Sequence, residues 1–339
     1  MGLTMQYRDI GKSGLKASVV GLGTFAIGGW FWGGTDEQKS IAAIQASIDR
    51  GVNLIDTAPI YGFGRAEQIV GKAIKGRRDK VIIATKVGLI WDSEEGEFSF
   101  YADDRWPTGE PSKYKVYRNL KPASIQKEIE SSLKRLDVEY IDLYQTHWQD
   151  STTPIEVTME MLEKLKDQGK IRAIGVSNVT VDHLKRYGNG IVSAQEKFSL
   201  IDRTIVEKRI VDYCLEHGIA ILSYFTLEQG LLTGRMSPTR QFQDGDTRKN
   251  DPKFTPENRQ RVNNLLKSLA PLTEKYTCSI TQLVIALTLT QPGITHVLVG
   301  ARDEKQATEN AVGGYLLLEE QDVQLMNSQF NEYLRKEGS

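Results

Sequence analysis

Four side chains that can move or orient protons stand at or just after short apolar runs in the first half of the chain. They are Asp56, Tyr61, Lys86 and His147. A free tyrosine, with a pKa of about 10, is a poor acid at neutral pH. A nearby ammonium favours the phenolate and so eases proton release. A carboxylate would keep that lysine charged, and a histidine can hydrogen-bond a substrate carbonyl. The set predicts a proton donor aimed at a developing oxyanion.

Each of these residues also has a purely structural interpretation. Asp56 can cap a turn and Tyr61 can pack in a Tyr-Gly turn. Lys86 can lie at a solvent-exposed strand end, and His147 can be a buried histidine whose ring nitrogens are hydrogen-bonded within the core. Taken singly, the structural interpretation is the better one for three of the four. Their joint placement on one rim favours chemistry, and because none of them is an electron source, a hydride cofactor has to supply the electrons.

The elements that position these residues follow from the pattern of the chain. Short apolar runs alternate with amphipathic segments eight times, which predicts a parallel sheet. Eight such units in one chain of 339 residues favour a closed α/β fold, the (β/α)8 or TIM barrel, over an open sheet. The expected strands are 18–23, 53–56, 81–85, 141–145, 171–176, 193–195, 219–224 and 295–300, and the expected helices are 36–50, 67–74, 124–136, 155–168, 181–187, 207–217, 256–276 and 305–313.

The remaining segments decorate this barrel. No linker or change of composition divides the chain, so we expect residues 1–339 to form a single domain. Residues 5–15 predict an N-terminal β-hairpin that plugs one end, and 280–290 predict an extra helix. Long loops follow the third and seventh strands, and catalytic groups of such barrels lie on the loops after the strands. The four residues above therefore come from three adjacent strand ends.

Composition excludes several classes of function. The chain has 43 Lys and Arg against 44 Asp and Glu, which argues against a nucleic-acid or basic membrane surface. Cys214 and Cys278 lack the spacing of a metal site, so we expect no metal. Two reduced thiols and an opening segment without an apolar signal core are typical of a cytoplasmic protein. Residues 17–35 carry no charge, but their glycines favour a strand and loop over a membrane helix.

The pair Gly21-x-Gly23 invites comparison with a dinucleotide-binding fingerprint. The third glycine is missing at the required spacing, and no acidic residue follows at a suitable strand end. Asp36 comes too early and begins a helix. We reject this interpretation.

Family motifs appear in order along nearly the whole chain, which resembles the aldo-keto reductase superfamily. The stretch 26–34, with Trp30 and Trp32, is similar to the bacterial branch that includes inositol-operon-associated and general-stress reductases. The motifs are Gly21-Leu-Gly-Thr24, Leu54-Ile-Asp-Thr-Ala58 with Tyr61-Gly62, Ala84-Thr-Lys86, Asp142-Leu-Tyr-Gln-Thr-His147 and Gly175-Val-Ser-Asn178.

This resemblance implies an oxidoreductase that reduces aldehydes or ketones to alcohols with NADPH, with Tyr61 as general acid in a tetrad with Asp56, Lys86 and His147. Ser177, Asn178 and Gln195 would hold the nicotinamide carboxamide, and Tyr224 would stack on its ring. The cofactor residues it implies are Gly23, Thr24, Ser177, Asn178, Gln195, Tyr224, Thr226, Leu227, Gly230, Leu232, Gly300, Arg302, Gln306, Glu309 and Asn310.

Two positions depart from the family pattern. Phe225 and Thr226 stand where many relatives have Ser-Pro, which puts the pyrophosphate strap in question. Gly300 stands where some relatives have a phosphate-binding lysine. The segment from Gly300 to Asn310 is instead similar to the variant in which an arginine, here Arg302, takes the 2′-phosphate beside a helix N-terminus. The structural alternative is an ordinary surface arginine.

All five tryptophans fall on the predicted catalytic rim, and the loop 88–120 adds more aromatic residues. They predict an apolar pocket for a small-molecule carbonyl substrate, although a long loop also needs a small core of its own. The residues expected in the substrate pocket are Phe25, Trp30, Trp32, Trp91 and Trp148.

Two other functions compete with that of a reductase. For each function, the sequence is compatible with a monomer. Some relatives of this fold serve ion channels as nicotinamide-binding, redox-sensing regulatory subunits. The absence of a long extra N-terminal segment favours the free enzyme. A barrel aldolase or isomerase using Lys86 as a Schiff base would leave the cofactor residues unexplained.

Overall fold

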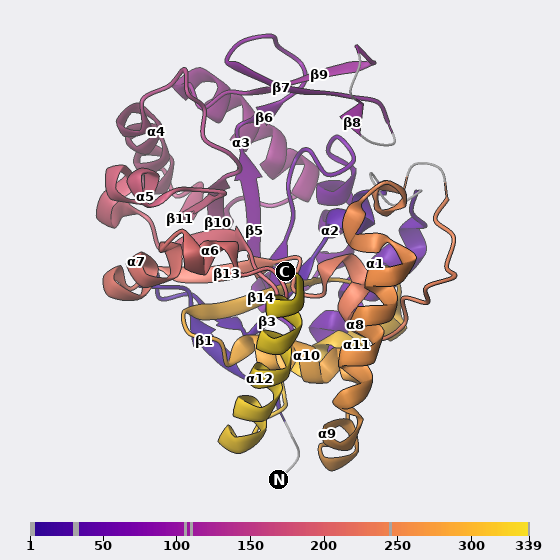
Figure 1. The fold of residues 1–339 in the computed structure, drawn as a ribbon. Helices are drawn as coiled ribbons and strands as arrows, with labels where there is room; N and C mark the ends of the chain where they lie inside the picture. The colour runs from indigo at the N-terminus through magenta and orange to yellow at the C-terminus, as the bar shows by residue number, and fades with distance from the viewer. Residues whose placement is uncertain (1–3, 30–33, 105–106, 109–110, 244–245, 338–339) are drawn as a thin grey trace.

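The computed structural model describes residues 4–29, 34–104, 107–108, 111–243 and 246–337. Eight parallel strands close into a barrel in the order β10-β11-β12-β13-β14-β3-β4-β5, with helices around it (Figure 1). The predicted (β/α)8 barrel is therefore confirmed. The barrel strands are β3 (Val20–Gly23), β4 (Leu54–Asp56), β5 (Ile82–Val87), β10 (Ile141–Thr146), β11 (Ile171–Ser177), β12 (Ser193–Lys197), β13 (Ala220–Tyr224) and β14 (Ile294–Gly300).

The α-helices follow the predicted segments with three differences. In place of the expected helix 207–217, a short helix ends at Glu207 and a second begins at Ile210, because Arg209 between them has a left-handed backbone. The expected helix 256–276 is two helices, because Pro271 falls in the first turn of a new one and lacks the N–H that a continuous helix needs. The C-terminal helix was not predicted at all. The helices are α1 (Glu37–Asp49), α2 (Arg65–Ile74), α3 (Pro122–Leu136), α4 (Ile155–Asp167), α5 (Val181–Tyr187), α6 (Thr204–Glu207), α7 (Ile210–His217), α8 (Pro256–Ser268), α9 (Ala270–Lys275), α10 (Ile280–Leu289), α11 (Glu304–Gly313) and α12 (Glu320–Glu337).

The predicted N-terminal hairpin is present as β1 (Tyr7–Asp9) and β2 (Lys16–Ser18), paired antiparallel. Ile10 and Leu15 of its turn are buried in one cluster with Leu54, Leu143 and Leu222 from inside the barrel. The hairpin therefore plugs one end of the barrel, which leaves the opposite end for the site.

A small antiparallel sheet fills the long loop after β5 and lies at the top of the view in Figure 1. The sequence predicted only a loop here, because two of its strands are two residues long and its longer strands mix charged with aromatic residues. The strand order is β6-β9-β7-β8, with β6 (Leu89–Ile90), β7 (Glu97–Ala102), β8 (Pro107–Thr108) and β9 (Tyr114–Arg118).

A second buried cluster lies beside the barrel and includes Leu266 of α8, Leu283 of α10 and Phe330 of α12. It packs against Leu231 and Leu232, so it supports the loop after β13 from outside the barrel. In the part of the chain that the structure describes, no helix is long and apolar enough to cross a membrane.

Candidate active site

Asp56 and Lys86 form a buried ion pair at the C-terminal ends of two neighbouring strands. Lys86 Nζ donates to both carboxylate oxygens of Asp56, each at 2.9 Å, and to the carbonyl of Thr57 at 2.9 Å. The lysine is 1% exposed. All three ammonium protons therefore have acceptors, which fixes the position of the charge. This is the pairing that the sequence predicted.

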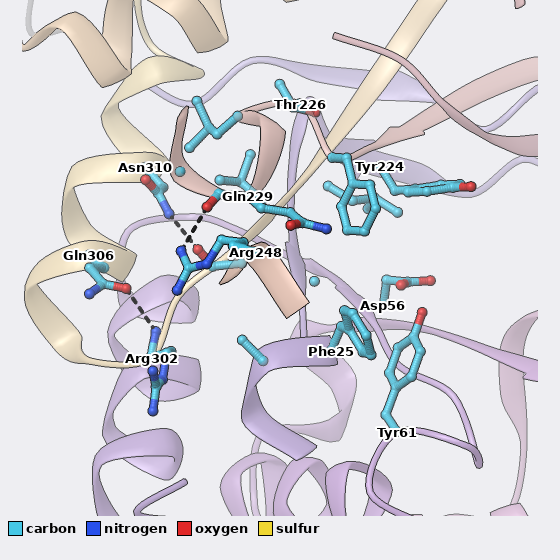
Figure 2. Close-up of a pocket in the computed structure, with 18 of the residues that line it drawn as sticks. Phe25, Asp56, Tyr61, Tyr224, Thr226, Gln229, Arg248, Arg302, Gln306 and Asn310 are labelled. Carbon is cyan, nitrogen blue, oxygen red and sulfur yellow. Dashed lines mark hydrogen bonds between the residues drawn. The ribbon is translucent and has the colours of Figure 1, made fainter. Parts of the chain in front are cut away.

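Tyr61 and His147 stand next to this pair. Lys86 Nζ lies 4.9 Å from the centre of the Tyr61 ring, and the Tyr61 and His147 ring centres are 5.9 Å apart in an edge-to-face arrangement. The structure thus brings the four predicted catalytic residues together. Figure 2 shows Tyr61 and Asp56 at one end of a cavity.

Gly28 allows the turn that carries Tyr61 to dock against the loop after β3. A Cβ added to Gly28 would lie 2.7 Å from the Tyr61 carbonyl oxygen. Gly62, at φ +66, faces it from the other side, and a Cβ there would lie 2.4 Å from the Gly28 carbonyl oxygen. Because both contacts are with backbone, only glycine fits at either position.

The electrostatics of Tyr61 differ from the sequence-based expectation. Burial, reinforced by the negative charge of Asp56, raises the pKa of Tyr61 well above its usual value. An eased proton release was expected from Lys86, but the carboxylate of Asp56 neutralises that ammonium at close range. The phenol therefore stays protonated near neutral pH, but it is a weaker acid than the neighbouring ammonium alone would make it.

His147 is neutral for a related reason. Burial and then the charge of Lys86 hold the pKa of His147 well below its usual value. Burial also lowers the pKa of Lys86, and the ion pair with Asp56 opposes that shift. A neutral imidazole can hydrogen-bond an oxygen without adding a second cation to the pocket.

Two glutamines complete the environment of Asp56, and sequence reasoning missed this role for both. Gln195 Nε2 donates to Asp56 Oδ1 at 2.7 Å, and Gln145 Nε2 lies 3.5 Å from the same oxygen. Both glutamines stand on barrel strands and point inward. The sequence placed Gln145 only within a family motif. Alternate residues of a barrel strand face the interior, and this alternation along β10 was the signal that could have identified Gln145.

A cavity of about 580 Å³ opens from the catalytic residues and runs between the loop after β13 and helix α11. Figure 2 shows Phe25, Asp56 and Tyr61 at one end, Arg302, Gln306 and Asn310 at the other, and Gln229 and Arg248 between them. In the described ranges, no group of three or more His, Cys, Asp or Glu could hold a metal ion.

Amide side chains and the ring of Tyr224 line part of the end near Tyr61. Asn178 Nδ2 donates to the carbonyl of His147 at 2.9 Å, and its Oδ1 accepts from the hydroxyl of Tyr224 at 2.7 Å. Ser177 Oγ donates to the carbonyl of Gln195 at 2.8 Å. The four residues expected around a nicotinamide therefore form one connected set.

The far end is cationic and lies at the start of α11. The amide of Arg302 donates to Gln306 Oε1 at 3.1 Å, and its guanidinium donates to the carbonyl of Gly34 at 2.9 Å. Arg235 pairs with Glu309 at 2.7 Å, and Asn310 Nδ2 donates to the carbonyl of Gly300 at 3.1 Å. Arg302 is exposed but lines the cavity, as the sequence predicted.

Arg248 lies between the two ends and was not predicted. Its guanidinium donates to the carbonyl of Gln229 at 3.0 Å and pairs with Asp246 at 2.6 Å. Arg240 also lines the cavity. Both arginines come from the long loop after β13, which folds back over the barrel. The sequence of this loop has no helical or strand periodicity, so it could not indicate where the two side chains lie.

Most, but not all, of the predicted binding residues line this cavity. Thr24 and Leu232 do not: Thr24 is buried behind the strand end, and Leu232 packs into the cluster with Leu266 and Phe330. The predicted residues that do line it are Gly23, Phe25, Asp56, Tyr61, His147, Trp148, Ser177, Asn178, Gln195, Tyr224, Thr226, Leu227, Gly230, Gly300, Arg302, Gln306, Glu309 and Asn310.

The aromatic prediction needs the larger correction. Trp91 lies outside the cavity wall because it packs edge-to-face on Phe63, with ring centres 5.3 Å apart. Phe100 of β7 lines the cavity instead. The predicted pocket residues Trp30 and Trp32, like Trp106, lie outside the described residues.

Known proteins similar to this chain share its sequence over nearly its whole length. It is 41% identical over 307 residues to the aldo-keto reductase YhdN of Bacillus subtilis (strain 168), a match that covers 89% of this chain and 86% of that protein. It is 39% identical over 330 residues to the NADH-specific methylglyoxal reductase of Escherichia coli (strain K12), covering 95% and 97%.

The solved structures agree. The glycerol dehydrogenase AKR11B4 from Gluconobacter oxydans superposes with a TM-score of 0.82 at 37% identity, covering 98% of this chain and 96% of that one. The sequence profile of the aldo/keto reductase family matches residues 19–329. This chain is therefore a member of the aldo/keto reductase family of oxidoreductases.

Proposed function

We propose that residues 1–339 form a single-domain, NADP(H)-dependent carbonyl reductase in which Tyr61 is the general acid. The observation that carries this proposal is the placement of Tyr61 beside the Lys86–Asp56 pair, at one end of a cavity whose far end is cationic. The cavity fits a dinucleotide in its chemistry. Amides of Asn178 and Gln195 can pair with a carboxamide, and arginines can pair with phosphates.

The residues of the chain then have separable tasks. A bound dihydronicotinamide supplies the hydride. Tyr61 donates its proton to the oxygen of the carbonyl as negative charge develops there. His147, neutral and 9% exposed, orients that oxygen, and Asp56 holds Lys86 against the phenol. Gly23 and Gly300 line the cavity at the ends of β3 and β14. A Cβ on either would meet no protein atom nearer than 3.7 Å, so a side chain there would take up free space of the cavity.

The substrate end favours an uncharged carbonyl compound. Besides the catalytic residues and the amides of Asn178 and Gln195, the described wall near Tyr61 includes the apolar side chains of Phe25, Ile60, Leu89 and Phe100. A carboxylate or phosphate on the substrate would lose its hydration there without gaining a charged partner. We infer that aldehydes and ketones without such groups are preferred.

A panel of carbonyl compounds tests this function. Loss of NADPH absorbance should follow addition of neutral aldehydes or α-dicarbonyls, and acidic or phosphorylated carbonyls should react more slowly. Faster turnover of the charged compounds would contradict the assignment of the substrate end.

Cofactor choice is tested by Arg302→Ala. The methylglyoxal reductase that is 39% identical is named NADH-specific, so the family alone does not decide. Arg302 offers a planar charged fork at the cationic end of the cavity. We expect wild type to prefer NADPH, and the variant to lose about 1–3 kcal/mol of NADPH binding while NADH binding hardly changes. Titration of both cofactors by protein fluorescence measures this.

Lys305→Ala is the matched control, because Lys305 is an exposed cation in the first turn of α11, three residues after Arg302, and does not line the cavity. It should leave both affinities unchanged. Equal losses for NADPH and NADH in Arg302→Ala would show that Arg302 does not contact a 2′-phosphate.

A further inference from the structure

The loop after β13 contains a run of backbone conformations that residues with a Cβ rarely adopt. Phe225, Glu228 and Gln229 have φ values of 58°, 43° and 52°, and Gly230 follows at 95°. Left-handed conformations are unfavourable for the three non-glycine residues. They persist only where surrounding contacts impose them. Because Phe225, Gln229 and Gly230 line the cavity between its two ends, this turn shapes the groove.

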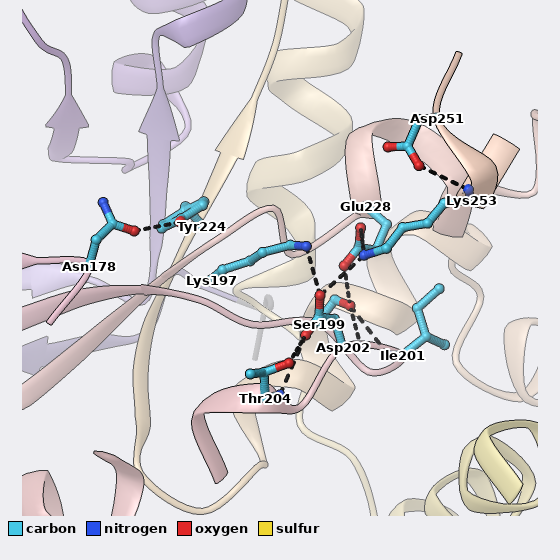
Figure 3. A network of polar contacts seen from close by, with 10 residues as sticks. All are labelled: Asn178, Lys197, Ser199, Ile201, Asp202, Thr204, Tyr224, Glu228, Asp251 and Lys253. Carbon is cyan, nitrogen blue, oxygen red and sulfur yellow. Dashed lines mark hydrogen bonds and ion pairs between the residues drawn. The ribbon is translucent and has the colours of Figure 1, made fainter. Parts of the chain in front are cut away.

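Glu228 is the residue whose side chain leaves the turn on the side away from the cavity. It is 3% exposed, and its carboxylate accepts from Ser199 Oγ at 2.9 Å and pairs with Lys253 Nζ at 3.4 Å (Figure 3). An unpaired carboxylate at this depth would be strongly unfavourable. Ser199 and Lys253 therefore hold the Glu228 carboxylate in its buried position.

Lys253 is itself held in place from several directions. Its ammonium pairs with Asp202 at 3.1 Å, and Asp202 also pairs with Lys197 at the end of β12. The backbone amide of Lys253 donates to Asp251, which caps the short helix Pro252–Phe254. Burial alone would lower the pKa of Lys253, but the nearby charges of Glu228 and Asp202 outweigh it and raise the pKa, so the side chain stays an ammonium. Figure 3 shows this network joining the loop to the barrel strand.

No proline stands between Phe225 and Gly230, so no ring restricts the backbone of this turn. Its restraint has to come from contacts with other segments of the chain.

We propose that Lys253 is a positioning residue that, acting through the buried carboxylate of Glu228, holds the left-handed turn 225–230 in the shape that the middle of the cofactor groove requires. Lys253 and Glu228 are not among the described residues that line the cavity. Their effect is therefore on the affinity for the cofactor, through its phosphates, more than on the chemical step. This inference rests on the proposed nicotinamide function of the groove.

Lys253→Met, which keeps the length of the side chain and removes its charge, tests the proposal with two readouts. In the protein without cofactor, hydrogen–deuterium exchange of a peptide covering 225–235 should become at least tenfold faster. The dissociation constant for NADPH should rise at least tenfold, while kcat at saturating NADPH falls far less. Lys253→Arg, which restores the charge, should recover most of both losses.

Lys275→Met is the matched control. Lys275 also bridges two carboxylates, Glu319 at 2.8 Å and Asp322 at 2.7 Å, but on the α9–α12 surface. It should leave exchange at 225–235 and NADPH affinity as in wild type. Wild-type exchange and affinity in Lys253→Met would overturn the proposal.

Glu228→Gln gives an independent variant if Lys253→Met fails to fold. It should show the same two effects. The double variant should lose no more NADPH affinity or exchange protection than the more impaired single variant, because both substitutions remove the same contact between Glu228 and Lys253. Additive losses would overturn the proposed route through Glu228. If wild type binds neither NADPH nor NADH, the proposed function fails. The exchange data then decide alone: faster exchange in Lys253→Met supports the anchoring of the turn, and unchanged exchange overturns it.

Discussion

Replacing Tyr61 with phenylalanine is expected to lower kcat for a good aldehyde by about 10²–10⁴-fold, the usual contribution of general acid catalysis. The ring and its edge-to-face contact with His147 remain, so packing changes little. What disappears is the hydroxyl, which is the proposed proton donor and which its raised pKa keeps in the protonated form. NADPH affinity, measured by fluorescence titration, should stay within about twofold of wild type, since the hydroxyl has no part in holding the cofactor.

Tyr144→Phe is the control for loss of a buried tyrosine hydroxyl. Tyr144 is fully buried on β10, and its hydroxyl has no hydrogen-bond partner among the described residues. Its removal should leave kcat unchanged. A Tyr61→Phe protein that turns over near the wild-type rate would remove Tyr61 from the role of proton donor.

Lys86→Met should abolish most activity and also destabilise the fold. Among the described residues, the variant leaves the buried carboxylate of Asp56 with only the amides of Gln195 and Gln145 as side-chain partners. Removing one member of a buried ion pair commonly costs about 3–5 kcal/mol. Urea unfolding should show a loss of this size. The value of kcat should fall by at least about 10²-fold, because Tyr61 would stand beside an unpaired negative charge.

The double variant Asp56→Asn with Lys86→Met separates the two effects. Removal of both charges should restore much of the lost stability, since no buried charge is left unpaired. Activity should not return. Recovery of activity together with stability would mean that the pair serves the fold alone.

The sequence predicted the barrel and its catalytic end well because both depend on local patterns. Strand ends are visible as apolar runs, and the barrel rule places Asp56, Lys86 and His147 on one rim. The hairpin was visible from Gly11 and Gly14. The C-terminal helix α12 was missed, although residues 320–337 have helical composition.

The remainder could not be predicted, because it depends on contacts between distant segments. Trp91 was expected in the pocket, but its direction is set by packing on Phe63 within the inserted sheet. Arg248 reaches Gln229 only through the fold of a long loop. Lys253 and Glu228 are 25 residues apart, and no pattern in the chain marks them as partners.

Transfer of a deuterium label tests the central claim most directly. Wild-type protein is incubated with a neutral aldehyde and NADPH that is deuterated at both C4 positions of the nicotinamide, in ordinary water. The account predicts one deuterium on the carbinol carbon of each alcohol formed, because the hydride comes from the cofactor and the hydroxyl proton from Tyr61. Tight binding of NADPH with no labelled alcohol from any carbonyl of the panel would contradict the account and favour a nicotinamide-sensing role without turnover.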